Sequence, residues 1–157
     1  MFNGGQEGAV RIDVLAELTI NSRAGDVAAF AMDPCNDTKL IGGIREVRIL
    51  TEPPFAVGTR VGRVASFLGK RIEYVLEVEE LRPGALIAMR SVKSPFPMHV
   101  TYEFDDVAGK TLARIRVQGD AGGFYRLAGP FMAGAVRRNI SGDLQRLIRL
   151  MESETGQ

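Results

Sequence analysis

Residues 71–81 read RIEYVLEVEEL, and this stretch decides the class of fold. Ile72, Tyr74, Leu76 and Val78 alternate with charged residues at positions 71, 73, 77 and 79. Successive side chains of a strand point to opposite faces of a sheet, so this strand has one apolar and one polar face. Such alternation is typical of an antiparallel sheet that is covered on one side only.

The same alternation recurs along most of the chain, with short turn-rich connectors between the runs. Met98–Asp105 repeats it, with Tyr102 on the apolar side and His99 on the polar side. Short links between successive strands favour antiparallel hairpins over parallel crossovers. We therefore predict about seven strands, at Val10–Ile20, Ile44–Leu50, Thr59–Leu68, Lys70–Leu81, Ala85–Val92, Pro97–Asp105 and Thr111–Gln118.

Helical patterns occupy two places. Two short helices are predicted at about 23–32 and 34–41, with Asp33 as N-cap and Pro34 at the first position of the second helix. A long helix is predicted from Gly122 to about Ser153, and it is the only segment long enough to cover the apolar sheet face. Its apolar stripe rotates next to Gly129-Pro130, which predicts a bend there. Leu144 and Leu147 are predicted to be core.

Bulk composition indicates one domain over residues 10–153, with flexible ends at 1–9 and 154–157. The chain has 157 residues and a formal charge of +1, from 20 basic and 19 acidic side chains. This balance does not favour nucleic-acid binding. No signal peptide and no run of about 18 apolar residues is visible, so we expect a cytoplasmic protein without a membrane span.

Several short sequence stretches indicate a family resemblance over about residues 10–152. The stretches that carry it are Leu18-Thr19-Ile20, Met32-Asp33-Pro34, Gly58-Thr59-Arg60, Glu77-Val78-Glu79-Glu80 with Arg82-Pro83-Gly84, Thr101-Tyr102-Glu103-Phe104, and Gly123-Phe124-Tyr125-Arg126-Leu127 with Arg137-Arg138. In order and spacing they resemble the START-like (SRPBCC) superfamily, in its polyketide cyclase/dehydrase-type branch. The resemblance implies an α+β helix-grip fold, a curved sheet around the long C-terminal helix, with a ligand cavity between them.

The polar residues give few candidates for catalysis. A single cysteine and a single histidine exclude an intrachain disulfide and a cysteine- or histidine-rich metal site, so no metal and no cofactor are predicted. His99 is expected to point outward, and Cys35 is expected to be a buried or half-buried structural thiol. For Arg63 and Arg90 the alternation does not decide which face of the sheet the side chain occupies, and an outward direction is favoured. An arginine that pointed inward could hold a carboxylate or enolate in the cavity.

A glycine-rich stretch, Gly119–Gly123, is interpreted as a turn rather than as an anion-binding loop. The predicted ligand pocket combines apolar strand positions with residues near the bend of the long helix. It comprises Tyr74, Leu76, Met89, Val100, Tyr102, Ile115, Phe124, Phe131 and Met132.

Three functions stay open at this stage. The first is binding of a hydrophobic or aromatic small molecule, lipid- or polyketide-like, with the tyrosines as orienting polar groups. The second is a cyclase or dehydratase acting on such a ligand, with a tyrosine or arginine polarising a carbonyl. The third is a non-catalytic interaction module with a vestigial cavity. A homodimer also stays open.

Overall fold

The computed structural model describes residues 10–121 and 129–155. The strands are β1 Val10–Ile20, β2 Ile44–Ile49, β3 Arg60–Phe67, β4 Lys70–Arg82, β5 Leu86–Lys93, β6 Met98–Val107 and β7 Lys110–Ala121. The helices are α1 Ala24–Ala31, the 3₁₀ turn η1 Pro34–Asn36, α2 Asp37–Leu40 and the long α4 Gly129–Thr155. This is the helix-grip fold that the sequence predicts.

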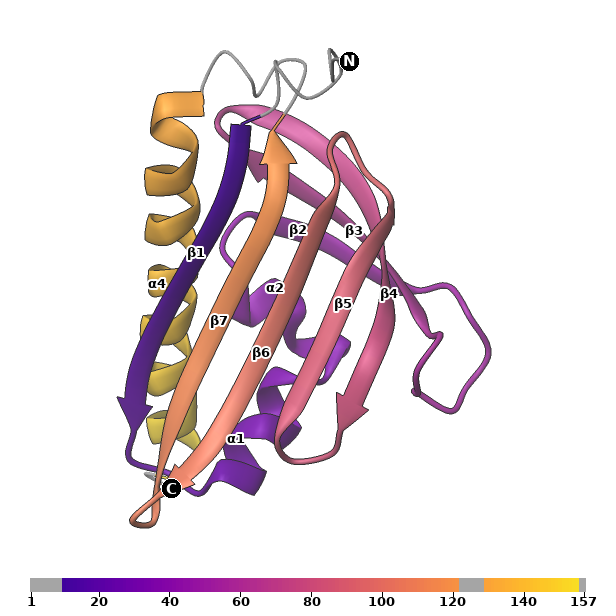
Figure 1. Ribbon diagram of the computed structural model, residues 1–157. Coiled ribbons are helices and arrows are strands. Elements are labelled where there is room, and N and C mark those ends of the chain that lie inside the picture. The colour runs from indigo at the N-terminus through magenta and orange to yellow at the C-terminus, as the bar shows by residue number, and fades with distance from the viewer. Residues whose placement is uncertain (1–9, 122–128, 156–157) are drawn as a thin grey trace, which may run out of the picture.

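The seven strands form one curved sheet in the order β1-β7-β6-β5-β4-β3-β2, and every neighbouring pair is antiparallel (Figure 1). Strands β2 to β7 follow one another as antiparallel neighbours, with connectors of two to four residues except for the longer one at 50–59 between β2 and β3. Strand β1 pairs with β7, for example Val14 opposite Val117, so the first strand of the chain lies beside the last.

The helices of residues 10–121 and 129–155 all lie on the apolar face of the sheet (Figure 1). Helix α4 packs against β1 and β7, and α1 packs against β6 and β7. The face they cover is the one predicted from alternation: Leu76 and Val78 of β4 and Phe104 of β6 are at most 3% exposed. None of the helices in the described ranges has the length and hydrophobicity needed to span a membrane.

Local sequence sets the boundary between the short helices and β2. The side chain of Asp33 accepts a hydrogen bond from the backbone N–H of Cys35 and caps η1, as predicted. Gly43 then turns the chain with φ +87°, and its carbonyl accepts from the N–H of Ser66 at 2.9 Å. A Cβ on Gly43 would lie 2.6 Å from the Ser66 carbonyl oxygen, so only glycine fits this approach.

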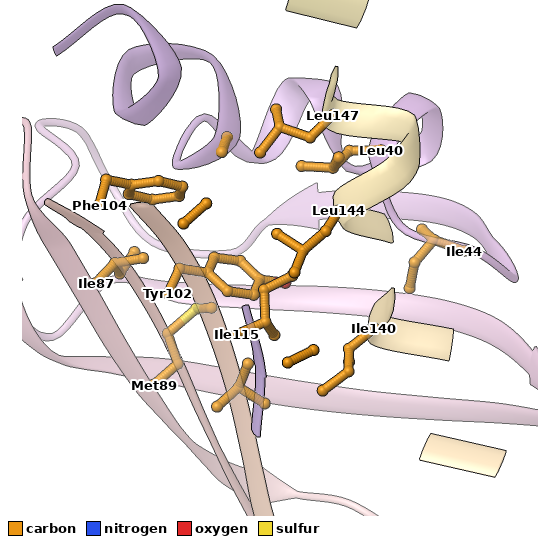
Figure 2. Packing of buried hydrophobic residues seen from close by; sticks show 14 of the residues in the cluster. Leu40, Ile44, Ile87, Met89, Tyr102, Phe104, Ile115, Ile140, Leu144 and Leu147 are labelled. Atoms are coloured by element: carbon orange, nitrogen blue, oxygen red, sulfur yellow. The ribbon is translucent and has the colours of Figure 1, made fainter. Parts of the chain in front are cut away.

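A fully buried part of the core lies between the C-terminal half of α4, the short helices and the sheet. Leu144 and Leu147 are 1% and 2% exposed. Figure 2 shows both pointing from α4 toward the sheet, with Leu40 of α2 beside them and Tyr102 of β6 below Leu144. The prediction that these two leucines are core is confirmed.

Two expectations need correction, and a third concerns residues outside the described ones. Cys35 is exposed rather than buried, because the capping turn at Asp33 directs residue 35 to the surface. Strand β7 extends to Ala121, so Gly119 and Asp120 belong to a strand paired with β1 and not to a turn. The described part of α4 begins at Gly129, and residues 122–128, where the first turns of the long helix and one arm of its bend were expected, lie outside the described residues.

The buried position of Leu144 gives the first prediction. Leu144→Ala should lower the free energy of unfolding by about 2–5 kcal/mol, because it removes buried methyl groups and leaves a cavity. Gln145→Ala, on the exposed side of the same turn, should change it by less than about 0.5 kcal/mol. Urea denaturation measures both. A loss below about 1 kcal/mol for Leu144→Ala would contradict the packing described here.

Candidate functional site

A cavity of about 120 Å³ lies between the concave sheet face and the N-terminal half of α4. Its wall is mostly apolar, with seven polar or charged residues among the lining side chains. The apolar wall includes Ile12, Ile41, Ile44, Ala65, Phe67, Ile72, Phe96, Met98, Val100, Ile115, Val117, Met132, Val136 and Ile140. The polar lining residues are Arg63, Ser66, Tyr74, Tyr102, Gln118, Asn139 and Asp143.

The predicted pocket residues divide into three groups. Tyr74, Val100, Tyr102, Ile115 and Met132 line this cavity. Leu76 and Met89 share the dry face but are 0% and 2% exposed and belong to the packed core away from the cavity wall. Phe131 is 75% exposed: it is one position, or about 100° of rotation, from the inward Met132. Phe124 lies outside the described residues.

Arg63 points inward, which corrects the outward direction favoured by the sequence. It is 5% exposed and shares the buried face of β3 with Val61 and Ala65. Its Nε donates to Oδ2 of Asp37 at 2.9 Å, and its Nη2 forms an ion pair with the same oxygen at 2.8 Å. Asp37, at the start of α2, is 2% exposed. A residue 26 positions away therefore compensates the charge of Arg63, and no local pattern in β3 indicates that partner.

Burial and pairing act in opposite directions on these two groups. Burial lowers the pKa of Arg63, but the nearby Asp37 carboxylate outweighs it and the pKa is raised, so Arg63 remains a cation. Burial raises the pKa of Asp37, while the guanidinium of Arg63 opposes this shift and the carboxylate of Asp33 adds to it. Such a pair stabilises the fold only while both members are present.

Asp143 is the second buried carboxylate of the site. Its Oδ1 accepts from the backbone N–H of Gly42 at 2.8 Å and from Nη2 of Arg146 at 2.6 Å. Burial raises the pKa of Asp143, opposed by the hydrogen bonds from Gly42 and Arg146. Sequence reasoning missed this residue, although an acidic side chain three positions after Ile140 and one before Leu144 lies on the apolar stripe of α4 and is a detectable signal.

The two tyrosines approach the same end of the cavity from β4 and β6. Tyr74 is opposite Arg63 in the β3–β4 register. Tyr102 is 5% exposed, and burial raises the pKa of its phenol, with Arg63 opposing the shift. Tyr102 therefore remains a neutral phenol at physiological pH, able to donate a hydrogen bond to a ligand oxygen.

The remaining candidate residues lie on the convex, polar side of the molecule. Arg90 points outward, as favoured, and pairs with Glu77 at 2.9 Å. His99 also points outward, and its Nε2 lies 2.6 Å from a carboxylate oxygen of Glu79. Within residues 10–121 and 129–155, no group of three or more His, Cys, Asp or Glu side chains is arranged to hold a metal ion.

Comparison with known families decides the relationship. The family model described as polyketide cyclase / dehydrase and lipid transport matches residues 11–152, which is nearly the whole chain. The chain belongs to this family. The START-like resemblance deduced from the sequence is thereby confirmed.

Several solved structures share the fold of this polyketide cyclase/dehydrase family member. Zhui aromatase/cyclase from Streptomyces sp. R1128 has TM-score 0.80 and 17% identity, covering 92% of this chain and 96% of that one. A protein from Thermus thermophilus has TM-score 0.76 and 18% identity, covering 87% and 94%. A START superfamily protein from Mycobacterium smegmatis has TM-score 0.75 and 11% identity, covering 90% and 97%. At these identities the likeness shows the fold alone. No curated protein matches the sequence.

The Arg63–Asp37 pair gives the second prediction. Asp37→Leu and Arg63→Met should each lower the free energy of unfolding by about 3–5 kcal/mol, because each leaves a buried charge without its partner in the interior. The double variant Asp37→Leu/Arg63→Met should be more stable than either single variant. Chemical denaturation of the three variants measures this coupling. Losses that simply add would show that the two residues do not act as a pair.

Asp143 gives a pH prediction of definite sign. Its folded-state pKa lies above the ordinary value of 3.8, so the folded chain binds this proton more readily than the unfolded chain. The contribution of Asp143 to stability is therefore least favourable above the folded pKa and improves as the pH falls toward about 3.8. We expect the unfolding free energy of the wild type minus that of Asp143→Asn to increase as pH is lowered from neutral.

An exposed carboxylate supplies the opposite control. The hydrogen bond from Arg116 lowers the pKa of Asp13, so its stabilising contribution is lost as pH falls. The unfolding free energy of the wild type minus that of Asp13→Asn should therefore decrease as the pH is lowered from neutral. Denaturation curves at several pH values compare the two, and the same slope for both would contradict the burial assigned to Asp143.

Proposed function

We propose that this protein binds a small, mostly apolar molecule carrying a ring or a short acyl chain in the cavity between the sheet and α4. The observation that carries the proposal is the lining: apolar side chains from the sheet and α4 surround a space to which only a few polar groups contribute. Ligand sites of small molecules have this composition, because apolar contacts give affinity and a few polar groups give orientation.

The volume of the cavity limits the ligand. A dry cavity of about 150 Å³ accommodates benzene, and this one measures about 120 Å³. The two volumes are similar, so the ligand is about the size of one aromatic ring or a few methylene groups, and it enters with small side-chain adjustments. A larger ligand requires side chains around the cavity to move. Binding would be driven by apolar burial at about 25 cal/mol per Å², before the entropic cost of association.

A cyclase or dehydratase is the second candidate function, and the position of the ionisable groups favours it. Arg63 and Asp143 both border the cavity, beside the phenol of Tyr102. A guanidinium or phenol can polarise a carbonyl, and a carboxylate of raised pKa can accept a proton from the neighbouring carbon. Recovery of the bound molecule unchanged would separate a carrier from such an enzyme.

Two tryptophan variants test the binding proposal. The wild-type chain has no tryptophan, so each variant also carries a single intrinsic fluorophore. Met132→Trp places extra volume inside the cavity and should weaken binding of toluene at least about tenfold. Phe131→Trp changes the adjacent exposed residue and should leave the affinity unchanged. Val136→Phe fills the same space from the next turn if Met132→Trp does not fold.

Protein-observed NMR titration measures these affinities, and native mass spectrometry of protein purified without detergent identifies what copurifies. We expect saturable shifts at cavity residues in the wild type and in Phe131→Trp. If the folded wild type shows no such shifts and nothing copurifies, the binding proposal is wrong and an interaction module with a vestigial cavity takes its place.

A further inference from the structure

Two ion pairs lie at the end of the cavity that Tyr102 borders, through the lining residues Arg63 and Asp143, and each pair contains a buried carboxylate. Arg63 lies 2.8 Å from Asp37, and Arg146 lies 2.6 Å from Asp143. The side chains of Arg63, Asp37 and Asp143 are at most 5% exposed, whereas that of Arg146 is 35% exposed. Two cations and two carboxylates balance, so this end of the cavity carries no excess positive charge.

Asp37 cannot leave Arg63 free for an anionic ligand. Its Oδ2 accepts a hydrogen bond from Nε of Arg63 and forms an ion pair with Nη2, and its backbone belongs to α2, which is held against β2 and α4. If a ligand carboxylate took its place, Asp37 would become a buried charge without a partner, which is strongly unfavourable. The Asp143 carboxylate, on the opposite wall, would repel the same ligand.

Tyr102 supplies a group that a neutral ligand can use. Its side chain lines the cavity and is 5% exposed. Within residues 10–121 and 129–155 its hydroxyl has no hydrogen-bond partner, and it is not among the side-chain atoms that are fully removed from solvent contact. The hydroxyl is therefore accessible from the cavity, where a carbonyl or hydroxyl oxygen of a ligand can accept its proton.

We propose that the cavity selects neutral ligands carrying a carbonyl or hydroxyl oxygen and rejects carboxylates of the same shape. The selectivity rests on the proposed binding function and assigns its ligand class. An arginine in an apolar pocket suggests an anion site on first inspection, but here its charge is already compensated by Asp37. Arg63 and Tyr102 then act as hydrogen-bond donors to a neutral oxygen.

Benzamide and benzoate test this selectivity, because they have the same shape and differ by one charge. At pH 7.5 the wild type should bind benzamide at least about tenfold more tightly than benzoate in protein-observed NMR titrations. Asp37→Asn, which frees the charge of Arg63, should raise the benzoate affinity at least about tenfold and leave that of benzamide nearly unchanged. Asp143→Asn removes a carboxylate that repels benzoate, so it should also raise the benzoate affinity relative to that of benzamide. This variant replaces Asp37→Asn if Asp37→Asn does not fold.

Asp13→Asn is the matched control, because it removes one carboxylate on the exposed convex face, where Asp13 pairs with Arg116. The preference of Asp13→Asn for benzamide over benzoate should equal that of the wild type. Benzoate binding in the cavity as tightly as benzamide would overturn the selectivity while leaving the binding function intact. If neither compound binds and toluene does not bind either, the binding function fails and the selectivity with it.

Discussion

One long helix and two short ones have to cover the apolar face of a seven-stranded sheet, and the rest of the structure depends on this mismatch in width. Strands lie about 4.8 Å apart, so seven of them span roughly 30 Å, whereas a helix with its side chains is about 10–12 Å wide. A flat sheet would leave most of its dry face in water. The sheet therefore curves around α4, and β1 pairs with β7 at the side where the helix lies (Figure 1).

Curvature alone does not fill the concave side evenly. Around the C-terminal half of α4, the helices α1 and α2 add a second set of side chains, and Leu144 and Leu147 pack tightly among them (Figure 2). Around the N-terminal half no further helix is present in the described part of the chain, and the cavity bordered by Met132 and Val136 lies there. The cavity therefore lies beside the N-terminal half of α4 because the short helices α1 and α2 pack only beside its C-terminal half.

The buried charges lie where these two regions meet. Asp37 joins α2 to β3 through Arg63, and Asp143 joins α4 to the end of α2 through the backbone of Gly42. Both carboxylates thus connect elements far apart in the chain and at the same time face or support the cavity. The interactions that fix the short helices on the sheet also determine the electrostatic character of the candidate site.

The sequence by itself determined the element order, the antiparallel pairing and the dry face, because strand alternation and helix stripes are periodic and short-range. It also determined that Tyr74, Val100, Tyr102, Ile115 and Met132 face inward. Only the tertiary structure decided that Arg63 points into the interior, that Asp37 neutralises it, and that Leu76 and Met89 pack away from the cavity wall. The strand around Arg63 has small or apolar residues on both faces, so its alternation does not fix the phase, and the partner that makes burial of the charge acceptable is brought in by packing of a distant helix.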